Sequence, residues 1–435
     1  MTGGLIIAAP KSGSGKTVIT AALFRHLRRH GIRMAAAKCG PDYIDPTFHA
    51  LASGGPCLNL DPWAMRPTTL SELVHELESA AELVLCEGVM GLFDGTGPNG
   101  DTGSTADLAR LTGWPVVLVV DAGGQGASVA ALIAGFARHD PRTPLAGVVL
   151  NRVVSPRHRA LLSDAITRHL PDLPVLGAVR GDENFELPAR HLGLVPADEV
   201  GDADTRLDRA AAHIAEICDI DALIALAKPA RCTVASGSPA LPPLGQHIAV
   251  AHDAAFLFIY EATLTGWRRQ GAEISFFSPL ADEAPAAAAD AIYLPGGYPE
   301  LHAGRLAAAT NFLDALRVAD EGIYGECGGY MVLGETLTDA GGATHRMAGL
   351  LPLKTSFAER RRHLGYRTAG LLAAGPLGGE GARFRGHEFH YATIVEENGD
   401  PLFAIADSSG NTLGRTGLRR GNIAGSFIHL IDRED

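Results

Sequence analysis

The first half of the chain alternates short apolar runs with longer amphipathic segments. The runs are GLIIAA (4–9), RMAAAKCG (33–40), ELVLCEG (82–88), PVVLVVDA (115–122), LAGVVLNRV (145–153) and PVLGAV (174–179). They are continuous rather than alternating, which predicts strands buried on both faces, as in a parallel sheet. Residues 17–31 have apolar positions at helical spacing and end at a glycine. The pattern predicts a doubly wound α/β domain over residues 1–225.

Residues 226–245 interrupt this pattern with four prolines and several small polar residues, which predicts a linker. Apolar runs then resume as HIAVAHD (247–253), EISFFSP (273–279), AIYLPGG (291–297) and IYGECGG (323–329), with a helical segment at 299–320. We expect a second α/β domain over 246–435. The predicted fold is therefore two doubly wound, mainly parallel-sheet domains.

Composition narrows the function classes. The 435 residues are enough for two cores, and a net charge of −12 without a long Lys/Arg run argues against a nucleic-acid partner. The six cysteines are scattered without a CxxC pair, so we expect reduced thiols rather than zinc or disulfides. No apolar run approaches 18 residues, and the N-terminus lacks the regions of a signal peptide. These features predict a cytoplasmic protein without a membrane segment.

The segment APKSGSGKT (9–17) joins a predicted strand to a predicted helix, the context of a phosphate-binding loop. Backbone N–H groups and the helix N-terminus at such a loop favour a polyphosphate. The general pattern has Gly where this chain has Pro10, so the loop is a variant. The predicted ATP-binding residues are Lys11, Gly13, Ser14, Gly15, Lys16 and Thr17.

Several polar side chains follow the other predicted strands of this domain. Because ligands bind at the carboxyl ends of parallel strands, we expect Lys38, Asp42, Asp45 and Glu87 to lie near Lys16. Thr17, Glu87 and either Asp42 or Asp45 could hold Mg²⁺, although each aspartate could instead cap a turn. Asp94 lies in the loop after Glu87. Asp121 is expected to be structural, and Asn151 could contact a base edge or cap a turn.

GECGGY, residues 325–330, places Cys327 in a Gly-x-Cys-x-Gly pattern after a strand. Such a strand-to-helix turn exposes a nucleophile, and a helix N-terminus lowers the pKa of a thiol. His429 on a late strand could be the base, and N–H groups near Gly297 and Tyr298 could bind an oxyanion. The alternative for Cys327 is a buried core cysteine.

RGHEFHYA (385–392) clusters His387, Glu388 and His390. The cluster is reminiscent of a metal site but lacks a third well-spaced ligand in the sequence. We therefore expect His390 to contact substrate or to lie in an interface strand.

These motifs together resemble a known family. The first half is similar to dethiobiotin synthetase, and the second to a triad-type, class I glutamine amidotransferase. With GPDYIDPTFH, CEGVMGLFDG, LPGGYPELH, GECGGYMVLG and GHEFHYA in this order, nearly the whole chain resembles the cobyrinic acid and hydrogenobyrinic acid a,c-diamide synthases. The usual triad has an acid two residues after the histidine, where this chain has Ile431. The sequence thus shows a dyad, Cys327 and His429, without its third member.

The resemblance implies a ligase of cobalamin biosynthesis that uses ATP, Mg²⁺ and L-glutamine. It implies that Cys327 releases ammonia from glutamine while a substrate carboxylate is activated by ATP as an acyl phosphate. Lys38, Asp42, Tyr43, Ile44, Asp45 and Asp94 would then line the substrate region or hold the intermediate. Ammonia would have to travel between the two domains. Lys11 occupies the place of the second lysine of some dimeric ATPases, which suggests a homodimer.

Three alternatives stay open at this stage. The chain could be a related a,c-diamide synthase acting on a nickel tetrapyrrole, or a cobyric acid synthase. A different class is a regulatory ATPase with the signature lysine Lys11 and an inactive glutaminase-like module. The sequence does not say whether the macrocycle carries cobalt.

Overall fold

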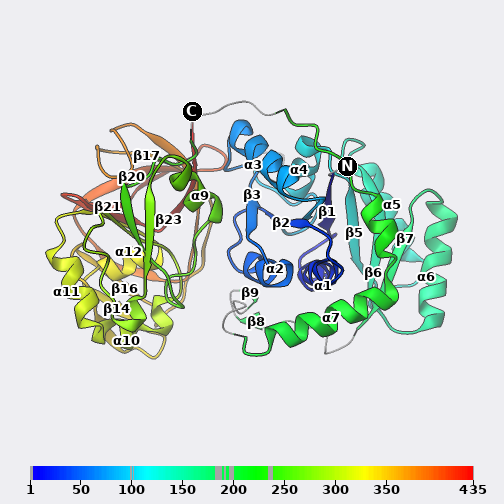
Figure 1. Ribbon diagram of the computed structural model, residues 1–435, viewed down its shortest axis with the longest axis horizontal. Helices are drawn as coiled ribbons and strands as arrows, with labels where there is room; N and C mark the ends of the chain where they lie inside the picture. Colours follow the sequence, from blue (N-terminus) through cyan, green and yellow to red (C-terminus); the bar gives the residue numbers. More distant parts are fainter. Residues whose placement is uncertain are drawn as a thin grey trace. The chain divides into compact units, whose positions relative to one another are not determined.

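The computed structural model describes residues 3–97, 100, 102–181, 189–190, 193–194, 200–233 and 239–434. The chain divides into two compact units, coloured along the sequence in Figure 1. Unit 1 comprises Met1–Trp63 and Pro67–Gly237, and unit 2 comprises Ala64–Arg66 and Ser238–Asp435. Each unit has its own sheet and its own core.

Unit 1 contains a seven-stranded sheet in which every neighbouring pair is parallel, in the order β3-β2-β4-β1-β5-β6-β7. Its strands are β1 (Gly3–Ala8), β2 (Met34–Cys39), β3 (Cys57–Leu60), β4 (Leu83–Glu87), β5 (Val116–Asp121), β6 (Leu145–Val153) and β7 (Val175–Arg180). A separate two-stranded ribbon pairs β8 (Ala189–Arg190) with β9 (Gly193–Leu194).

The helices of unit 1 cover both faces of this sheet (Figure 1). They are α1 (Lys16–Arg29), α2 (Asp45–Ser53), α3 (Pro67–Ala80), α4 (Thr105–Thr112), α5 (Ser128–His139), α6 (Pro156–His169), α7 (Ala203–Ile217) and α8 (Ile220–Ala225). Helices α1, α2 and α7 pack together, whereas α3 packs on β2, β3 and β4. Every residue of β1 is buried, as expected for a central strand covered on both faces.

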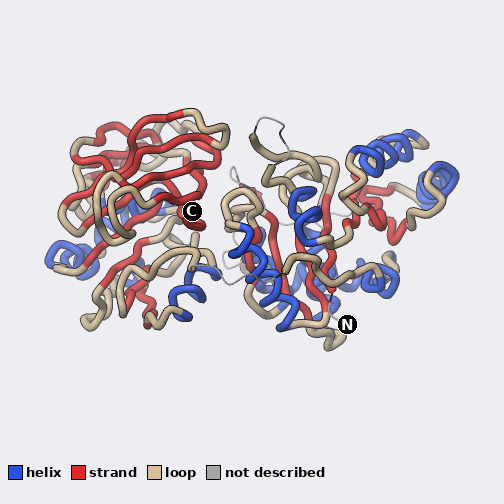
Figure 2. Tube along the Cα trace, turned by 90° about the horizontal axis from the view of Figure 1, so that it is seen from above, coloured by secondary structure: helices blue, strands red, loops and turns tan. Residues whose placement is uncertain are grey.

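Unit 2 contains a ten-stranded mixed sheet in the order β11-β10-β12-β13-β22-β21-β20-β17-β18-β23. The strands from β11 to β22 pair in parallel and those from β22 to β23 pair antiparallel. They are β10 (His247–Ala251), β11 (Glu273–Phe277), β12 (Ala291–Leu294), β13 (Gly322–Glu326), β17 (His363–Leu371), β18 (Arg383–His390), β20 (Asp400–Asp407), β21 (Thr412–Arg420), β22 (Ile423–Ser426) and β23 (Ile428–Arg433). In Figure 2, strands are far more prominent than helices in the unit that contains the C-terminus.

A four-stranded sheet accompanies it, in the order β15-β14-β16-β19. These strands are β14 (Thr336–Thr338), β15 (Thr344–Arg346), β16 (Leu353–Ser356) and β19 (Thr393–Glu397). The helices of unit 2 are α9 (Glu261–Arg269), α10 (Ala303–Ala308), α11 (Thr310–Val318) and α12 (Gly328–Leu333), with 3₁₀ turns at Pro279–Ala281 and Pro299–Leu301. The α/β class is confirmed, and the second sheet has an antiparallel half in addition to the expected parallel strands.

Two local expectations differ from the structure. The helical segment expected at 299–320 is a 3₁₀ turn followed by α10 and α11, which are separated at Ala309, whose ψ of 74° is not helical. Within the expected linker, Lys228 exchanges two backbone hydrogen bonds with Gly4 in unit 1, whereas Leu241 is buried in a core of unit 2. Among the described residues, no helix has the length and apolar character needed to cross a membrane.

Candidate active sites

The phosphate loop and two acidic strand ends meet at one edge of the sheet in unit 1. In the strand order, β4 lies between β2 and β1, and Glu87 is paired in register with both Lys38 and Ile7. The loop after β1 therefore lies beside the last residues of β2 and β4. This confirms the expectation that Lys16, Lys38 and Glu87 lie at the same edge.

The loop is built around Gly15, the residue that precedes α1. Gly15 has φ 92°, a left-handed conformation that glycine adopts at little cost. The Asn151 side-chain amide donates a hydrogen bond to the Ser14 carbonyl at 2.9 Å, and a Cβ on Gly15 would lie 2.2 Å from that amide nitrogen. Ser14 in turn donates to the Lys11 carbonyl at 2.9 Å. Asn151 thus holds the loop in place, a role that the sequence did not indicate.

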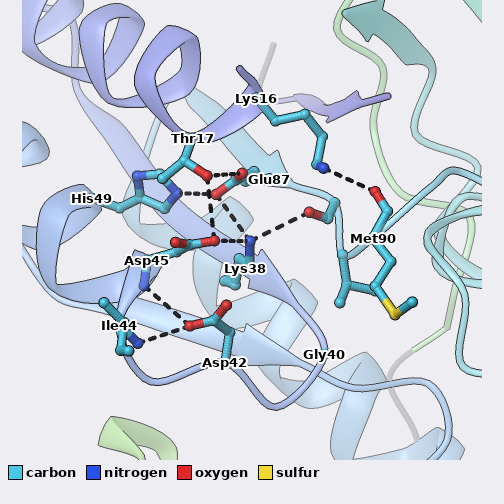
Figure 3. Close-up of polar contacts among 12 residues, drawn as sticks. Lys16, Thr17, Lys38, Gly40, Asp42, Ile44, Asp45, His49, Glu87 and Met90 are labelled. Atoms are coloured by element: carbon cyan, nitrogen blue, oxygen red, sulfur yellow. Dashed lines mark hydrogen bonds and ion pairs between the residues drawn. The ribbon is translucent and has the colours of Figure 1, made fainter. Parts of the chain in front are cut away.

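Lys16 is buried and donates to the Met90 carbonyl at 2.8 Å (Figure 3). Burial lowers the pKa of the Lys16 ammonium, an effect that the nearby Glu87 opposes. Met90 itself has φ 47°, a left-handed backbone that is uncommon for methionine. The loop after β4 therefore adopts a costly conformation in which its carbonyl points at the phosphate-loop lysine.

Three further side chains contact Glu87, which is fully buried, and Asp45 joins them through Thr17 and Lys38 (Figure 3). The Thr17 hydroxyl donates to Glu87 Oε1 at 2.7 Å and lies 3.4 Å from Asp45 Oδ2. Lys38 Nζ lies 3.0 Å from Glu87 Oε2 and also donates to Asp45 Oδ2. The His49 Nε2 lies 2.6 Å from Glu87 Oε2.

The electrostatics of this cluster follow from burial and the shared lysine. Burial by itself would raise the pKa of Glu87, but Lys38 and His49 together lower that pKa below its ordinary range. Burial and the neighbouring Asp42 raise the pKa of Asp45 to about 7, although Lys38 opposes them. Burial would lower the pKa of Lys38, but Asp45 and Glu87 raise it well above its ordinary value. Lys38 is therefore a permanent cation, held between two carboxylates.

The two aspartates that the sequence left as alternatives have different surroundings. Asp42 Oδ1 accepts the backbone N–H groups of Ile44 at 2.8 Å and Asp45 at 3.1 Å, so its carboxylate caps the start of α2. Asp45 instead directs its carboxylate at Thr17 and Lys38. Tyr43 and Ile44, between them, are buried.

Two other acids of this unit hold turns. Asp94 is exposed and accepts the Gly91 N–H at 2.9 Å, which closes the loop after β4. Asp121 accepts the Gly123 N–H and pairs with Arg152, consistent with the structural role expected for it. Their side chains are engaged in the fold rather than in the cluster around Glu87.

His49 was missed by the sequence reasoning. It is fully buried on α2, four residues after Asp45, so both side chains lie on one face of that helix. The spacing Asp45-x-x-x-His49 was the available signal. Because His49 contacts Glu87 through Oε2, the oxygen that also faces Lys38, it orients that carboxylate and leaves Oε1 to Thr17.

In unit 2, Cys327 lies at the turn between β13 and α12. Its backbone has φ 45° and ψ −98°, a strained conformation for a residue with a side chain. The Cys327 N–H donates to the Ser426 carbonyl at 2.8 Å, and its sulfur lies 3.8 Å from the Phe389 carbonyl oxygen. The strained backbone matches the expected nucleophile turn, but Cys327 is 3% exposed and packs in a hydrophobic core, so the expected exposure of the thiol is not found.

The Gly-Gly turn after β12 lies against both predicted catalytic residues. A Cβ on Gly296 would lie 2.5 Å from His429 Cε1, so a side chain here would displace the imidazole. A Cβ on Gly328, directly after Cys327, would lie 3.0 Å from the Gly297 nitrogen. The Gly297 N–H group is thus close to the nucleophile turn, where an oxyanion would form. Tyr298 is buried and packs edge-to-face on Phe258.

The protonation states of Cys327 and His429 differ from those expected from the sequence. Burial, followed by Glu300, raises the pKa of the Cys327 thiol, and the Gly328 N–H opposes this only weakly. The expectation of a lowered thiol pKa was wrong because burial outweighs the N-terminus of a helix of only six residues. Burial and the nearby His387 and His390 lower the pKa of His429 well below its ordinary value. The resting pair is a neutral thiol and a neutral imidazole.

The His-Glu-His cluster also differs from expectation. His363 of β17 lies opposite His390 of β18, and potential ligand atoms of His363, Glu388 and His390 lie within 4.8 Å of one another. The statement that a third group is lacking was therefore wrong, because strand pairing supplies it from a distant segment. Arg367 donates to Glu388 from both Nε and Nη2, at 2.9 and 2.7 Å. This guanidinium already supplies the countercharge, which favours an ion-pair network over a divalent cation.

His390 stacks on Phe427 with ring centroids 3.9 Å apart, and His387 stacks on His429 at 4.9 Å. The two histidines of the motif therefore belong to the surroundings of the thiol site. Ile431, at the position where the usual triad has its acid, is a buried apolar residue. The carboxylate found near His429 is instead Glu326, whose Oε2 lies 3.8 Å from His429 Nδ1.

Comparisons with known proteins agree with a nucleotide site in unit 1 and a glutaminase site in unit 2. Residues 5–195 match the CobQ/CobB/MinD/ParA nucleotide binding domain, and residues 247–435 match the CobB/CobQ-like glutamine amidotransferase domain. The chain is 53% identical to the hydrogenobyrinate a,c-diamide synthase of Rhizobium meliloti, over 99% of both chains. It is 54% identical to that of Brucella abortus and 51% identical to that of Mesorhizobium japonicum, each over 99% of this chain and 98% of the relative.

Proposed function

The chain belongs to the family of hydrogenobyrinate a,c-diamide synthases, and from that premise we propose that it amidates the a and c acetate carboxylates of hydrogenobyrinate. It is a carbon–nitrogen ligase with glutamine as the amido donor. Its nucleotide-binding domain supplies the activation by ATP. The cobalt-containing cobyrinate is a second candidate substrate, which the experiment below includes.

In unit 2, the proposed reaction is hydrolysis of the glutamine side-chain amide. His429 accepts the Cys327 proton as the sulfur attacks the amide carbon, and the Gly297 N–H receives the developing oxyanion. The imidazolium then gives its proton to the leaving ammonia. Water, deprotonated by His429, attacks the thioester carbon, which releases glutamate and restores the thiol.

In unit 1, a substrate carboxylate oxygen attacks the γ-phosphorus of ATP, and ADP leaves. Ammonia then attacks the acyl carbon of the acyl phosphate, phosphate leaves, and one proton is lost to give the amide. Lys16 would exchange the Met90 carbonyl for the β/γ-phosphates. Lys38 is placed to neutralise the carboxylate or phosphate oxygens that enter beside it.

The oxygen atoms of Thr17, Asp45 and Glu87 suit Mg²⁺, which takes hard oxygen ligands. The ion, when bound with ATP, would draw charge from the phosphate oxygens. Asp45 fits this role better than Asp42, because the Asp42 carboxylate is engaged by two backbone N–H groups. Contacts of Tyr43, Ile44 and Asp94 with the macrocycle remain proposals, as does a contact of His390 with glutamine.

Lys11 is exposed next to the loop and is available to a second subunit, so we include a homodimer in the proposal. We also place the enzyme in the cytoplasm, in keeping with its reduced thiols.

The observation that carries the proposal is the convergence of Thr17, Lys38, Asp45 and Glu87 beside the loop lysine. A regulatory ATPase would need no such cluster for a carboxylate substrate.

The test offers the purified protein hydrogenobyrinate or cobyrinate with MgATP and glutamine, and counts the added amides by mass spectrometry. Two amides on hydrogenobyrinate are expected. Four additions would instead identify a cobyric acid synthase. No amidation of either corrin, with ATP hydrolysis intact, would favour the regulatory ATPase.

A further inference from the structure

The predicted glutaminase has a cysteine and a histidine, but Ile431 stands where the usual class I triad has an acid. The structure offers a different carboxylate. Glu326 is the last residue of β13 and directly precedes Cys327 in the chain. It is 4% exposed. The strand beside β13 is β22, and the chain runs from the end of β22 directly into β23, which carries His429.

Three contacts define how the Glu326 carboxylate lies. The Tyr293 hydroxyl donates to Oε2 at 2.9 Å, and the Leu430 N–H donates to Oε1 at 3.3 Å. Oε2 also lies 3.8 Å from His429 Nδ1, within ion-pair distance but longer than a hydrogen bond. Donors from β12 and β23 thus aim the carboxylate at the side of the imidazole that carries Nδ1.

The chemistry of the pair requires an anion at this place. Since the resting thiol and imidazole are both neutral, proton transfer from Cys327 creates an imidazolium in a buried site. An unpaired buried cation is costly, and His387, stacked on the same ring, is neutral because burial lowers its pKa to about 3. Burial raises the pKa of Glu326 to about 7, so its carboxylate is ionised above neutral pH, and a new imidazolium would favour the anion further.

We propose that Glu326 is the positioning residue that orients His429 through Nδ1 and stabilises its imidazolium, in place of the acid missing at position 431. This inference rests on the proposed roles of Cys327 and His429. An Nδ1–H directed at Glu326 leaves Nε2 as the basic nitrogen for the thiol. The separation of 3.8 Å shortens to a hydrogen bond once the imidazole is charged.

The alternative is that Glu326 serves only to hold Tyr293 and Leu430. Glu326→Gln separates the two roles, because glutamine keeps an acceptor oxygen and similar volume but loses the charge. The matched control is Glu397→Gln, since Glu397 also accepts a tyrosine hydroxyl, that of Tyr330 at 2.7 Å, in the same unit. Glu326→Asp, which keeps the charge on a shorter arm, is the second variant.

The experiment measures glutamate release for kcat and KM, and the rate of Cys327 alkylation by iodoacetamide. For Glu326→Gln we expect kcat to fall about 10²-fold, with KM for glutamine within about threefold of wild type. Alkylation should slow in parallel, because less thiolate forms. Glu326→Asp should recover part of kcat, and Glu397→Gln should behave as wild type.

The inference would be overturned by a Glu326→Gln kcat within threefold of wild type, by equal losses in Glu326→Gln and Glu397→Gln, or by a loss expressed mainly as a raised KM. Equal kcat values in the Gln and Asp variants would also overturn it, since the charge would then be irrelevant. A wild-type protein without glutaminase activity would instead contradict the proposed function, so the two failures can be told apart.

Discussion

Replacing Lys38 with methionine tests the electrostatic account of the cluster in unit 1. Lys38 is 2% exposed and is the cation shared by Asp45 and Glu87, both largely buried. Methionine preserves most of the packing volume but leaves the two carboxylates without their shared cation. Removing one partner of a buried ion pair costs about 3–5 kcal/mol, and we expect a loss of this size at pH 8.

The loss should depend on pH, with a sign set by the pKa shifts. Lys38 has a raised pKa in the folded state, so its contribution is present throughout the acidic and neutral range. Glu87 has a lowered pKa, so its contribution is present above the ordinary carboxyl pKa and is lost as the pH falls. Without Lys38, both carboxyl groups should have raised pKa values. Protonation at pH 5.5 should then reduce the loss of stability. The reduction is about 1.4 kcal/mol per carboxyl group for each pH unit below its raised pKa.

Hydrogen exchange of peptides from β2 and β4 would measure the local opening free energy at both pH values. Lys354→Met is the matched control, because Lys354 also faces two glutamates, Glu335 and Glu396, but is 40% exposed. Its exchange, read at β16, should change far less than that of Lys38→Met, because solvent screens an exposed ion pair. A Lys38→Met effect that is no larger than the control, or that grows as the pH falls, would refute the reasoning.

Two further substitutions test the geometry of each site. Gly296→Ala should displace the His429 imidazole and lower glutamine-dependent amidation at least tenfold, while ammonia-dependent amidation is unchanged. The control is Gly375→Ala, where no atom lies within 4 Å of the new Cβ, and it should leave both activities unchanged. Asn151→Ala should weaken binding of an ATP analogue by about tenfold in calorimetry, the value of one lost hydrogen bond and a loosened loop, and should leave glutaminase activity unchanged. A loss of ammonia-dependent activity in the first variant, or unchanged ATP affinity in the second, would contradict the roles assigned.

Most parallel strands could be predicted, because a strand covered on both faces is a continuous apolar run. The four-residue parallel strands β3 and β22 were missed, since CLNL and IAGS are too short and too polar to give that signal. The antiparallel strands gave no such signal. β17 and β18 are buried on part of their length and carry arginines and histidines, and pairings such as His363 with His390 join segments far apart in the sequence. This long-range pairing supplied the third member of the His-Glu-His cluster.

The candidate sites show the same division. Lys16, Thr17, Lys38 and Glu87 were predictable, because a phosphate loop and strand ends are local patterns with a fixed place in an α/β sheet. The positions of Glu326 and Asn151 were not predicted, since their partners come from distant segments of the chain. The thiol pKa was misjudged because burial, the dominant cause, is a property of the folded chain.

The central claim is that Cys327 provides the nitrogen for both amides formed with ATP. The direct measurement uses glutamine labelled with ¹⁵N at the side-chain amide, together with hydrogenobyrinate and MgATP, and follows the product mass. The account predicts two ¹⁵N atoms in each product, none with Cys327→Ala, and two again when that variant receives ¹⁵N-ammonium. Label transfer by Cys327→Ala from glutamine, or unlabelled diamide from the wild type, would contradict it.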